Sequence, residues 1–543
     1  MGETSGPQGP HGPSRRTVLA GAGALALGAC TSGSPSPSAT AGVGTASPSP
    51  SGDATTTAGT TPSRTGTISG GPGWVRAENA RPGTTAWRID QAHLASETEL
   101  AGYTDTVSVL PGDSFGLHLS SALGPVTVRA YRLGHYAGAG AREVWASDPV
   151  AATKRPSPTT DALHTVRCSW PESLRVPTTG WPEGSYLLRL QAGGRARYVP
   201  MVVRSRATAG RLVLVSAVAT HQAYNQWGGH SLYKGPDQSF ATRAAAVSFE
   251  RPYDRNGAPL VLAYEQGVVL VAESLDLDLA YVTSWDLHHE PDLLAGARGV
   301  VSPGHDEYWT LPMRRHVEAA RDAGVNLGFL GANAVYWRAR FSGDGRLLTC
   351  YKSATADPQQ GSAETTAQWR QSPHPDPENS LTGMLYEAFP AEADLVVHDA
   401  DFFLLAGTGA ARGDTYAGLV ATEIDRAYPV AGTPTNLQVV AHSPVPQAGK
   451  PDTHSDLTYY SAPGGAGVLS VGTLAWTAGL RGAHARPRID GRAATFARTV
   501  TTNLFRAMAD GPMGRAHPAR GNLAAIGASP STRTGTGGPV ASA

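Results

Sequence analysis

The segment after Arg211 constrains the fold more than any other part of the chain. Short runs of consecutive apolar residues at 212–216, 279–283 and 325–330 alternate with segments of helical pattern. A strand that is apolar at nearly every position is buried on both faces, and alternation with helices places such strands parallel in one sheet. We therefore expect an α/β domain over residues 206–517, with a parallel sheet covered by helices on both faces.

The sequence predicts one helix of this domain especially clearly, over residues 312–323. Thr310 can cap its start, Pro312 lies in its first turn, and Gly324 follows its end. These residue types are the ones preferred at the corresponding helix positions. A further helical pattern covers residues 260–272.

Residues 73–205 follow a different pattern, which is typical of β-structure. Apolar and polar residues alternate within short stretches separated by Gly and Pro turns. The stretches are 105–119, 126–131, 184–190 and 198–203. Short strands of this kind favour a β-sandwich of immunoglobulin-like type.

Both ends of the chain differ from the folded part. Residues 14–19 contain a twin arginine, and the apolar run behind them is too short to span a bilayer and ends at Cys30. We predict a twin-arginine lipoprotein signal over 1–30, lipidation of Cys30, and a location on the outer face of the cell membrane. Residues 31–72 are mostly Ser, Thr, Pro, Gly and Ala, which predicts a disordered tether, and 518–543 are predicted to be a disordered tail.

The overall composition excludes several classes of protein. Lys and Arg together number 44, as do Asp and Glu, so the chain lacks the basic excess expected of a nucleic-acid-binding protein. Three cysteines are too few for a disulfide scaffold or a four-thiolate zinc site. Hydrophobic residues make up 41% of the chain, which is enough for large cores.

Functional side chains concentrate in three predicted loops of the α/β domain, at 217–233, 303–309 and 331–337. In an open α/β sheet, ligands bind beyond the carboxyl ends of the strands, and these loops follow three such ends. The loops contain Tyr224, His305, Glu307 and Asn333. We therefore predict a functional site at this edge of the sheet.

The chain offers no convincing nucleophile. It contains no G-x-S-x-G motif, Cys168 falls in the β region, and Cys350 lies beyond a turn, so both thiols are expected to be small buried hydrophobes. Asn333 stands where a glutamine amidotransferase-like sheet has its cysteine. Hydrolysis would then need water activated by a metal or by a carboxylate. Asp306 and Glu307 are adjacent and point in diverging directions, which makes them a poor acid/base pair for glycoside cleavage.

Three sequence blocks are specific enough to indicate a family. They are Gln-Ala-Tyr-Asn-Gln-Trp-Gly-Gly at 222–229, Ser-Pro-Gly-His-Asp-Glu-Tyr-Trp at 302–309 and Gly-Ala-Asn-Ala-Val-Tyr-Trp at 331–337. Over residues 210–510 the chain resembles the C-terminal domain of the N,N-dimethylformamidase large (β) subunit. Residues 102–134 are similar to the β domain that precedes it.

This resemblance implies an α/β fold like that of class I glutamine amidotransferases and a mononuclear iron site. The iron, as Fe(III), would be held by two tyrosines and one glutamate, which are hard anionic ligands. The resemblance carries Glu307 and Tyr224 over as ligands, and Tyr186 is assigned as the third by spacing. The residues implied for catalysis or for the pocket are His305, Glu307, Asn333 and Glu423.

The sequence thus predicts an exported, lipid-anchored, metal-dependent hydrolase that cleaves a C–N bond of a small non-peptide amide. The dimethylformamidase large subunit works inside the cell with a small partner subunit, whereas this chain has an export signal, so the substrate and the oligomeric state stay open. The alternative is a non-catalytic cell-surface protein that binds a glycan or another envelope component. Retention of a metal by the purified protein distinguishes the two hypotheses.

Overall fold

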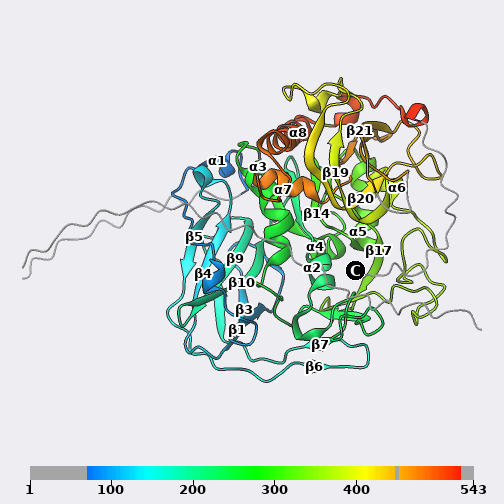
Figure 1. Ribbon diagram of the computed structural model, residues 1–543. Helices are drawn as coiled ribbons and strands as arrows, with labels where there is room; N and C mark the ends of the chain where they lie inside the picture. The colour runs from blue at the N-terminus through cyan, green and yellow to red at the C-terminus, as the bar shows by residue number, and fades with distance from the viewer. Residues whose placement is uncertain (1–69, 447–451, 527–543) are drawn as a thin grey trace, which may run out of the picture.

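The computed structural model describes residues 70–446 and 452–526 (Figure 1). The predicted signal at 1–30 and nearly all of the predicted tether at 31–72 lie outside these ranges. Within them, no helix is both long enough and apolar enough to cross a bilayer.

The first part of the described chain is β-rich and contains two main sheets. Their strand orders are β1-β3-β8 and β2-β10-β9-β4-β5. Alternate residues of both sheets, among them Phe115, Leu117, Leu188 and Met201, share one hydrophobic core, which confirms the predicted period of two. The strands are β1 (Leu100–Thr104), β2 (Ser108–Val109), β3 (Ser114–Ser121), β4 (Thr127–Leu133), β5 (Ala141–Ala146), β8 (Leu174–Pro177), β9 (Gly184–Ala192) and β10 (Arg195–Val203). The smaller elements are α1 (Trp74–Asn79), η1 (Gln91–His93), η2 (Tyr136–Gly138), β6 (Thr159–Thr160) and β7 (Val166–Arg167).

A seven-stranded sheet of order β13-β11-β14-β16-β23-β22-β21 forms the centre of the second part. Its strands are β11 (Leu212–Ser216), β13 (Leu279–Thr283), β14 (Gly299–Gly304), β16 (Asn326–Gly331), β21 (Gln438–Pro444), β22 (His454–Ser461) and β23 (Gly467–Ser470). The first five strands in the order are parallel, whereas β22 and β21 run antiparallel to their neighbours. The predicted parallel sheet is therefore found in five strands, whereas the edge formed by β22 and β21 is antiparallel. Short connections join β21, β22 and β23, and only antiparallel neighbours can be joined in this way.

Helices cover both faces of this sheet, as the sequence predicts. Leu214 and Val301 pack with residues of α3, α7 and α8, whereas Val213 and Val300 pack on the other face with residues of α4 and α5. The helices are α2 (Val218–Tyr224), α3 (Gln266–Glu273), α4 (Ser284–His289), α5 (Leu311–Asp322), α6 (Asn379–Thr382), α7 (Ala475–Arg481), α8 (Gly491–Asp510) and α9 (Met513–Ala516). The single-turn elements are η3 (Trp227–Gly229), η4 (Val261–Glu265), η5 (Phe403–Leu405) and η6 (Leu523–Ile526).

The best-signalled helix, α5, forms where the sequence predicts it. The Thr310 hydroxyl accepts a hydrogen bond from the backbone N–H of Met313 at 3.3 Å, and Gly324 follows the helix with φ of 96°. The cap satisfies a donor that the first turn leaves free, and glycine adopts the left-handed conformation at little cost.

Two smaller sheets extend the α/β part on the side of the carboxyl ends of its strands. One has the order β12-β18-β17-β15, and the other is a two-stranded ribbon of β19 and β20. Their bounds are β12 (Ala246–Ser248), β15 (Tyr308–Thr310), β17 (Trp337–Phe341), β18 (Leu347–Thr349), β19 (Leu385–Val396) and β20 (Thr415–Arg426). The ribbon joins the central sheet through a bridge between Ile424 and Thr473.

The two parts of the chain are joined by a buried ion pair. Arg132 of β4 and Glu273 of α3 lie 2.5 Å apart, and both side chains are fully excluded from solvent. Tyr281 of β13 donates a further hydrogen bond to the same carboxylate. Such a pair is sensitive to the loss of either partner.

Residues 518–526 of the predicted disordered tail lie within the described ranges and are held against the folded chain, whereas 527–543 lie outside them. The Asn522 side chain accepts from the backbone N–H of Val439 at 2.7 Å and donates to its carbonyl at 3.0 Å. These two bonds place Asn522 beside β21 at the edge of the central sheet. They fix the chain at this point, although its composition resembles that of a linker.

Candidate active site

Three strand ends place the functional loops at one edge of the central sheet. Tyr224 ends helix α2, which follows β11, His305 and Glu307 follow β14, and Asn333 follows β16. The structure thus brings together the loops that the sequence predicts to meet.

The loop backbones approach one another too closely for side chains at two positions. A Cβ atom at Gly331 would lie 1.6 Å from the carbonyl oxygen of Gly304, and one at Gly304 would lie 2.4 Å from Cβ of Tyr264. The next loop is then held by backbone hydrogen bonds of 3.0 Å from Val335 to Asp306 and from Tyr336 to Glu307. Close approach of this kind permits glycine only and puts the side chains of the two loops within reach of one another.

Glu307 lies at the centre of the site and is fully buried. Its Oε1 accepts hydrogen bonds from the Tyr233 hydroxyl and from Asn333 Nδ2, the latter at 3.2 Å. Its Oε2 has no hydrogen-bond partner among the described residues. A buried carboxylate oxygen without a donor is costly, so this atom is the first candidate for binding a cation.

A second carboxylate, Glu423, reaches the site from the ribbon strand β20. Asn333 Nδ2 donates to its Oε2 at 2.7 Å, so one amide nitrogen holds both carboxylates. His305 Nε2 lies 3.7 Å from an oxygen of each. Burial raises the pKa of Glu423, with the charge of Glu307 raising it further and His305 acting in the opposite direction.

Two phenols complete the cluster. The Tyr224 hydroxyl lies 2.8 Å from His305 Nε2, and the rings of Tyr224 and Tyr233 are 4.8 Å apart between centroids. Trp337 Nε1 donates to the Tyr233 hydroxyl at 3.0 Å. Burial and then the charge of Glu307 hold the pKa of both tyrosines well above the usual value. A nearby cation would reverse this effect and favour the phenolates.

The buried side chain of Lys352 flanks the same cluster. Its Nζ lies 2.9 Å from the centroid of the Tyr233 ring and 4.8 Å from that of Trp337, and it has no hydrogen-bond partner among the described residues. Burial lowers the pKa of Lys352 to about 7, with Glu307 acting in the opposite direction. The ammonium is therefore held by aromatic faces and by the field of the carboxylates.

The structure does not place Tyr186 in this cluster. It lies in β9 within the core of the β-rich part, where its hydroxyl donates to the carbonyl of Pro182 at 2.5 Å and its ring stacks on Trp181. Tyr233 is the second tyrosine beside Glu307, and the assignment by spacing missed it. Its only sequence signal was its position in the same loop as Tyr224.

Asp306 points away from its neighbour, as expected of adjacent residues. Its Oδ2 accepts a hydrogen bond from Ser302 Oγ at 2.9 Å, and burial raises its pKa to about 6. Cys168 and Cys350 are also outside the site chemistry, since burial raises the pKa of each thiol to about 12. A thiol in such surroundings stays protonated and is a poor nucleophile.

The donor set fits a hard cation. Tyr224, Tyr233 and Glu307 offer oxygen ligands, and Oε2 of Glu307 has no hydrogen-bond partner in the part of the chain that the structure describes. Within the described ranges, no three His, Cys, Asp or Glu side chains are arranged to hold a metal. A metal at this site would therefore depend on the tyrosine oxygens.

The buried carboxylates, the histidine and the phenols thus lie at the carboxyl edge of an α/β sheet, where open sheets of this kind bind their ligands. The chain belongs to the family described as N,N-dimethylformamidase beta subunit-like, C-terminal, which matches residues 127–489, about two thirds of its length. Every residue of the cluster lies within the match. The family relates the chain to the hydrolase dimethylformamidase. No protein of curated function matches the sequence.

Proposed function

We propose that this protein is an iron-dependent hydrolase that cleaves the C–N bond of a small non-peptide amide. The observation that carries the proposal is the buried cluster around Glu307, in which two phenols and a partnerless carboxylate oxygen lie beside a histidine, an amide and a second carboxylate. Family membership supports the same chemistry.

Tyr224, Tyr233 and Glu307 would hold the iron. When bound, ferric iron supplies a Lewis acid suited to hard anionic ligands. The chain positions two of these residues through further hydrogen bonds: Thr220 Oγ1 accepts from the Glu307 backbone N–H at 2.9 Å, and Trp337 Nε1 donates to the Tyr233 hydroxyl.

Proton movement falls to His305 and Glu423. Hydrolysis joins the oxygen of water to the carbonyl carbon, and a proton from that water ends on the leaving nitrogen as the C–N bond breaks. Burial raises the pKa of Glu423, which makes its carboxylate a better proton acceptor than one exposed to solvent. His305 Nε2 lies 3.7 Å from Glu423 and 2.8 Å from the Tyr224 hydroxyl, a position from which it can pass a proton to the amine.

Asn333 orients the carboxylates. Its Nδ2 donates to both Glu307 and Glu423, and its Oδ1 has no hydrogen-bond partner among the described residues. Its nitrogen is thus already engaged, and the free carbonyl oxygen is an acceptor for the attacking water. Its backbone N–H is held by Asp425 at 2.9 Å.

We also propose the finer features of fold and location that the sequence predicts. The shared core of the two N-terminal sheets supports an immunoglobulin-like sandwich, and the five parallel strands support a relationship to glutamine amidotransferases. The sequence of residues 1–30 supports export by the twin-arginine route and anchoring through lipid on Cys30. Metabolic labelling with a fatty acid tests the anchor: wild-type protein should be labelled and the Cys30→Ser variant should not.

Metal analysis tests the enzyme directly. Protein lacking residues 1–30 should contain near-stoichiometric iron and show a tyrosinate charge-transfer band, and the Tyr233→Phe and Glu307→Ala variants should lose both. Tyr186→Phe is the matched control and should keep both. A panel of small amides then identifies the substrate by release of amine. Protein that stays colourless and metal-free after reconstitution with iron would refute the proposal and favour the surface binding protein.

A further inference from the structure

The segment that joins the two site tyrosines, residues 225–232, contains little regular structure, and one buried side chain binds its backbone. Arg251 lies just after β12 and is 1% exposed. Its Nη1 donates to the carbonyls of Trp227 at 3.1 Å and His230 at 2.8 Å. Its Nη2 donates to the carbonyls of Gln222 at 3.3 Å and Asn225 at 2.8 Å.

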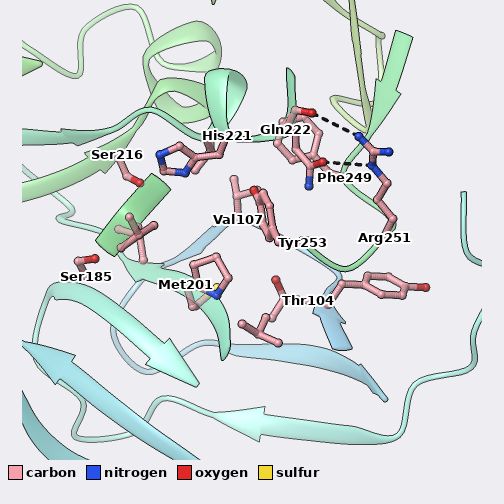
Figure 2. A pocket seen from close by; sticks show the side chains of 16 residues that line it. Thr104, Val107, Ser185, Met201, Ser216, His221, Gln222, Phe249, Arg251 and Tyr253 are labelled. Atoms are coloured by element: carbon pink, nitrogen blue, oxygen red, sulfur yellow. Dashed lines mark hydrogen bonds between the residues drawn. The ribbon is translucent and has the colours of Figure 1, made fainter. Parts of the chain in front are cut away.

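Figure 2 shows Arg251 facing Gln222 at the wall of a cavity between the two parts of the chain. Besides the backbone contact, Arg251 Nε donates to Gln222 Oε1 at 3.3 Å. The guanidinium thus forms hydrogen bonds with the end of helix α2 and with the turns that follow it.

No carboxylate of the described residues forms an ion pair with Arg251. Burial lowers its pKa to about 10, which still leaves it charged at neutral pH. A buried cation without an anion is unfavourable unless dipoles replace the lost water. Here the carbonyls at the end of α2, where the helix dipole is negative, and those of the next turns fulfil this role.

A second contact fixes the same segment against the chain around Arg251. Asn225 Oδ1 accepts from the backbone N–H groups of Trp227 and Asp254, both at 3.0 Å, and Asn225 Nδ2 donates to the carbonyl of Pro252 at 2.9 Å. Residues 222–230 are therefore shaped by the chain at 251–254 rather than by hydrogen bonds to a sheet.

We propose that Arg251 is the positioning residue that sets the separation of the Tyr224 and Tyr233 hydroxyls. Within the segment, the Leu232 N–H donates to the carbonyl of Ala223 and the Gly229 N–H to that of Gln226. Four carbonyls, counting the helix end, converge on the one planar cation of Arg251. The consequence for metal binding rests on the proposed function, whereas the consequence for the order of the segment in metal-free protein does not.

The cavity makes a chemical test available. It is lined by Arg251 together with His221, Gln222 and Tyr253. Removal of the side chain in Arg251→Ala would leave a guanidinium-shaped space that opens onto it. Guanidinium ion added at low millimolar concentration, far below denaturing levels, should refill this space.

The primary measurement is hydrogen exchange of the peptide spanning residues 222–233 in metal-free protein. In Arg251→Ala we expect exchange in this peptide to accelerate about tenfold or more, because several hydrogen bonds to a charged donor are lost. Exchange elsewhere should stay near that of wild type. Guanidinium should restore slow exchange, whereas methylammonium, which lacks the planar fork, should not.

Arg197→Met is the matched control. Arg197 is equally buried, pairs with Glu97 and donates to the carbonyls of Ala95 and Tyr253, so its loss also disturbs the chain at 251–254. Among the described residues, however, it donates to no carbonyl of the 222–233 segment, so it separates that indirect effect from loss of the direct contacts. If Arg251→Ala leaves exchange of the segment at the wild-type rate, or disturbs it no more than Arg197→Met does, the proposal is wrong. If Arg251→Ala does not fold, Arg251→Lys replaces it in the same measurement, because lysine keeps the charge but reaches fewer carbonyls. Exchange of the 222–233 peptide at the wild-type rate in Arg251→Lys would also overturn the proposal.

The second measurement uses iron-loaded protein. Arg251→Ala should weaken and shift the tyrosinate charge-transfer band, and guanidinium should restore it, whereas Arg197→Met should keep the wild-type spectrum. An unchanged band in Arg251→Ala would overturn the link to the ligands. Wild-type protein that binds no iron would instead refute the proposed function, and the exchange measurement would still decide the role of Arg251.

Discussion

The substitution Asn333→Asp tests whether one amide holds the two site carboxylates together. Asparagine and aspartate have nearly the same shape, and both tolerate the left-handed backbone found here, with φ of 57°. The variant therefore leaves the loop intact. It replaces a nitrogen that donates to Glu307 at 3.2 Å and to Glu423 at 2.7 Å with a third carboxyl group.

The size of the effect follows from these contacts. Each hydrogen bond to a charged group contributes about 1.5–3 kcal/mol, so the two together are worth about 3–6 kcal/mol. Uptake of a proton by one of the three carboxyl groups relieves part of the loss. We expect metal-free Asn333→Asp to lose about 3 kcal/mol of unfolding free energy at pH 8.

The loss should depend on pH with a definite sign. In the folded variant the crowded carboxyl groups have raised pKa values, so the folded state holds more protons than the unfolded state. Stability relative to wild type then falls as pH rises above the unfolded values of about 4. Urea denaturation of chelator-treated protein at pH 5 and pH 8 measures this difference.

A double variant provides the control. In Asn333→Asp/Glu423→Gln the donor and acceptor exchange places, because the new amide can donate to the new carboxylate, and we expect at least about half of the lost stability to return. If Asn333→Asp is as stable as wild type at pH 8, or if its loss is the same at both pH values, the assigned role of Asn333 is wrong.

Three further predictions concern other parts of the structure. Cys350→Ala should keep at least about half of the amide hydrolysis rate, because a thiol whose pKa is raised to about 12 is no nucleophile; a loss of two orders of magnitude in kcat would contradict this. Burial raises the pKa of Asp425 to about 8, so wild type should lose stability as pH rises from about 4 to 8, because this carboxyl ionises in the unfolded state while it stays protonated in the folded state. Asp425→Asn should therefore raise Tm at pH 8 and have little effect at pH 5, and an equal shift at both would exclude the carboxyl group as the cause. Arg132→Met leaves the fully buried carboxylate of Glu273 without its ion-pair partner and should lower the free energy of unfolding by about 3–5 kcal/mol, measured by urea denaturation. A loss below about 1 kcal/mol would show that this ion pair between the two parts contributes little to stability.

The local elements of the fold were predictable because their signals are local. Strand β11 is apolar throughout, and helix α5 has its cap, its proline and its terminal glycine within the sequence itself. Strands β21 to β23 were not predicted, and with them the antiparallel edge of the central sheet was missed. The same reason applies to residues 518–526, which were predicted to be disordered: Asn522 bonds to strand β21, and the composition of this segment does not reveal that contact.

The site also has a part that the sequence predicts and a part that it does not. By itself the sequence determined which polar residues are available and at which edge of the sheet they lie. Tyr224, His305, Glu307 and Asn333 follow strands whose carboxyl ends share one edge of a parallel sheet, whatever the details of packing. Only the tertiary structure decided that Tyr233, and not Tyr186, lies beside Glu307. Strand order and the path of an irregular loop set that distance, and neither is encoded in spacing along the chain.

Glu423 shows the physical reason most plainly. Its carboxylate shares an amide nitrogen with Glu307, yet it arrives on a ribbon strand more than a hundred residues further along the chain. A motif constrains side chains that follow the same strand or turn, because the backbone geometry between them is repetitive. The approach of two distant carboxylates depends instead on how a ribbon packs across a sheet, and that is a property of the folded molecule alone.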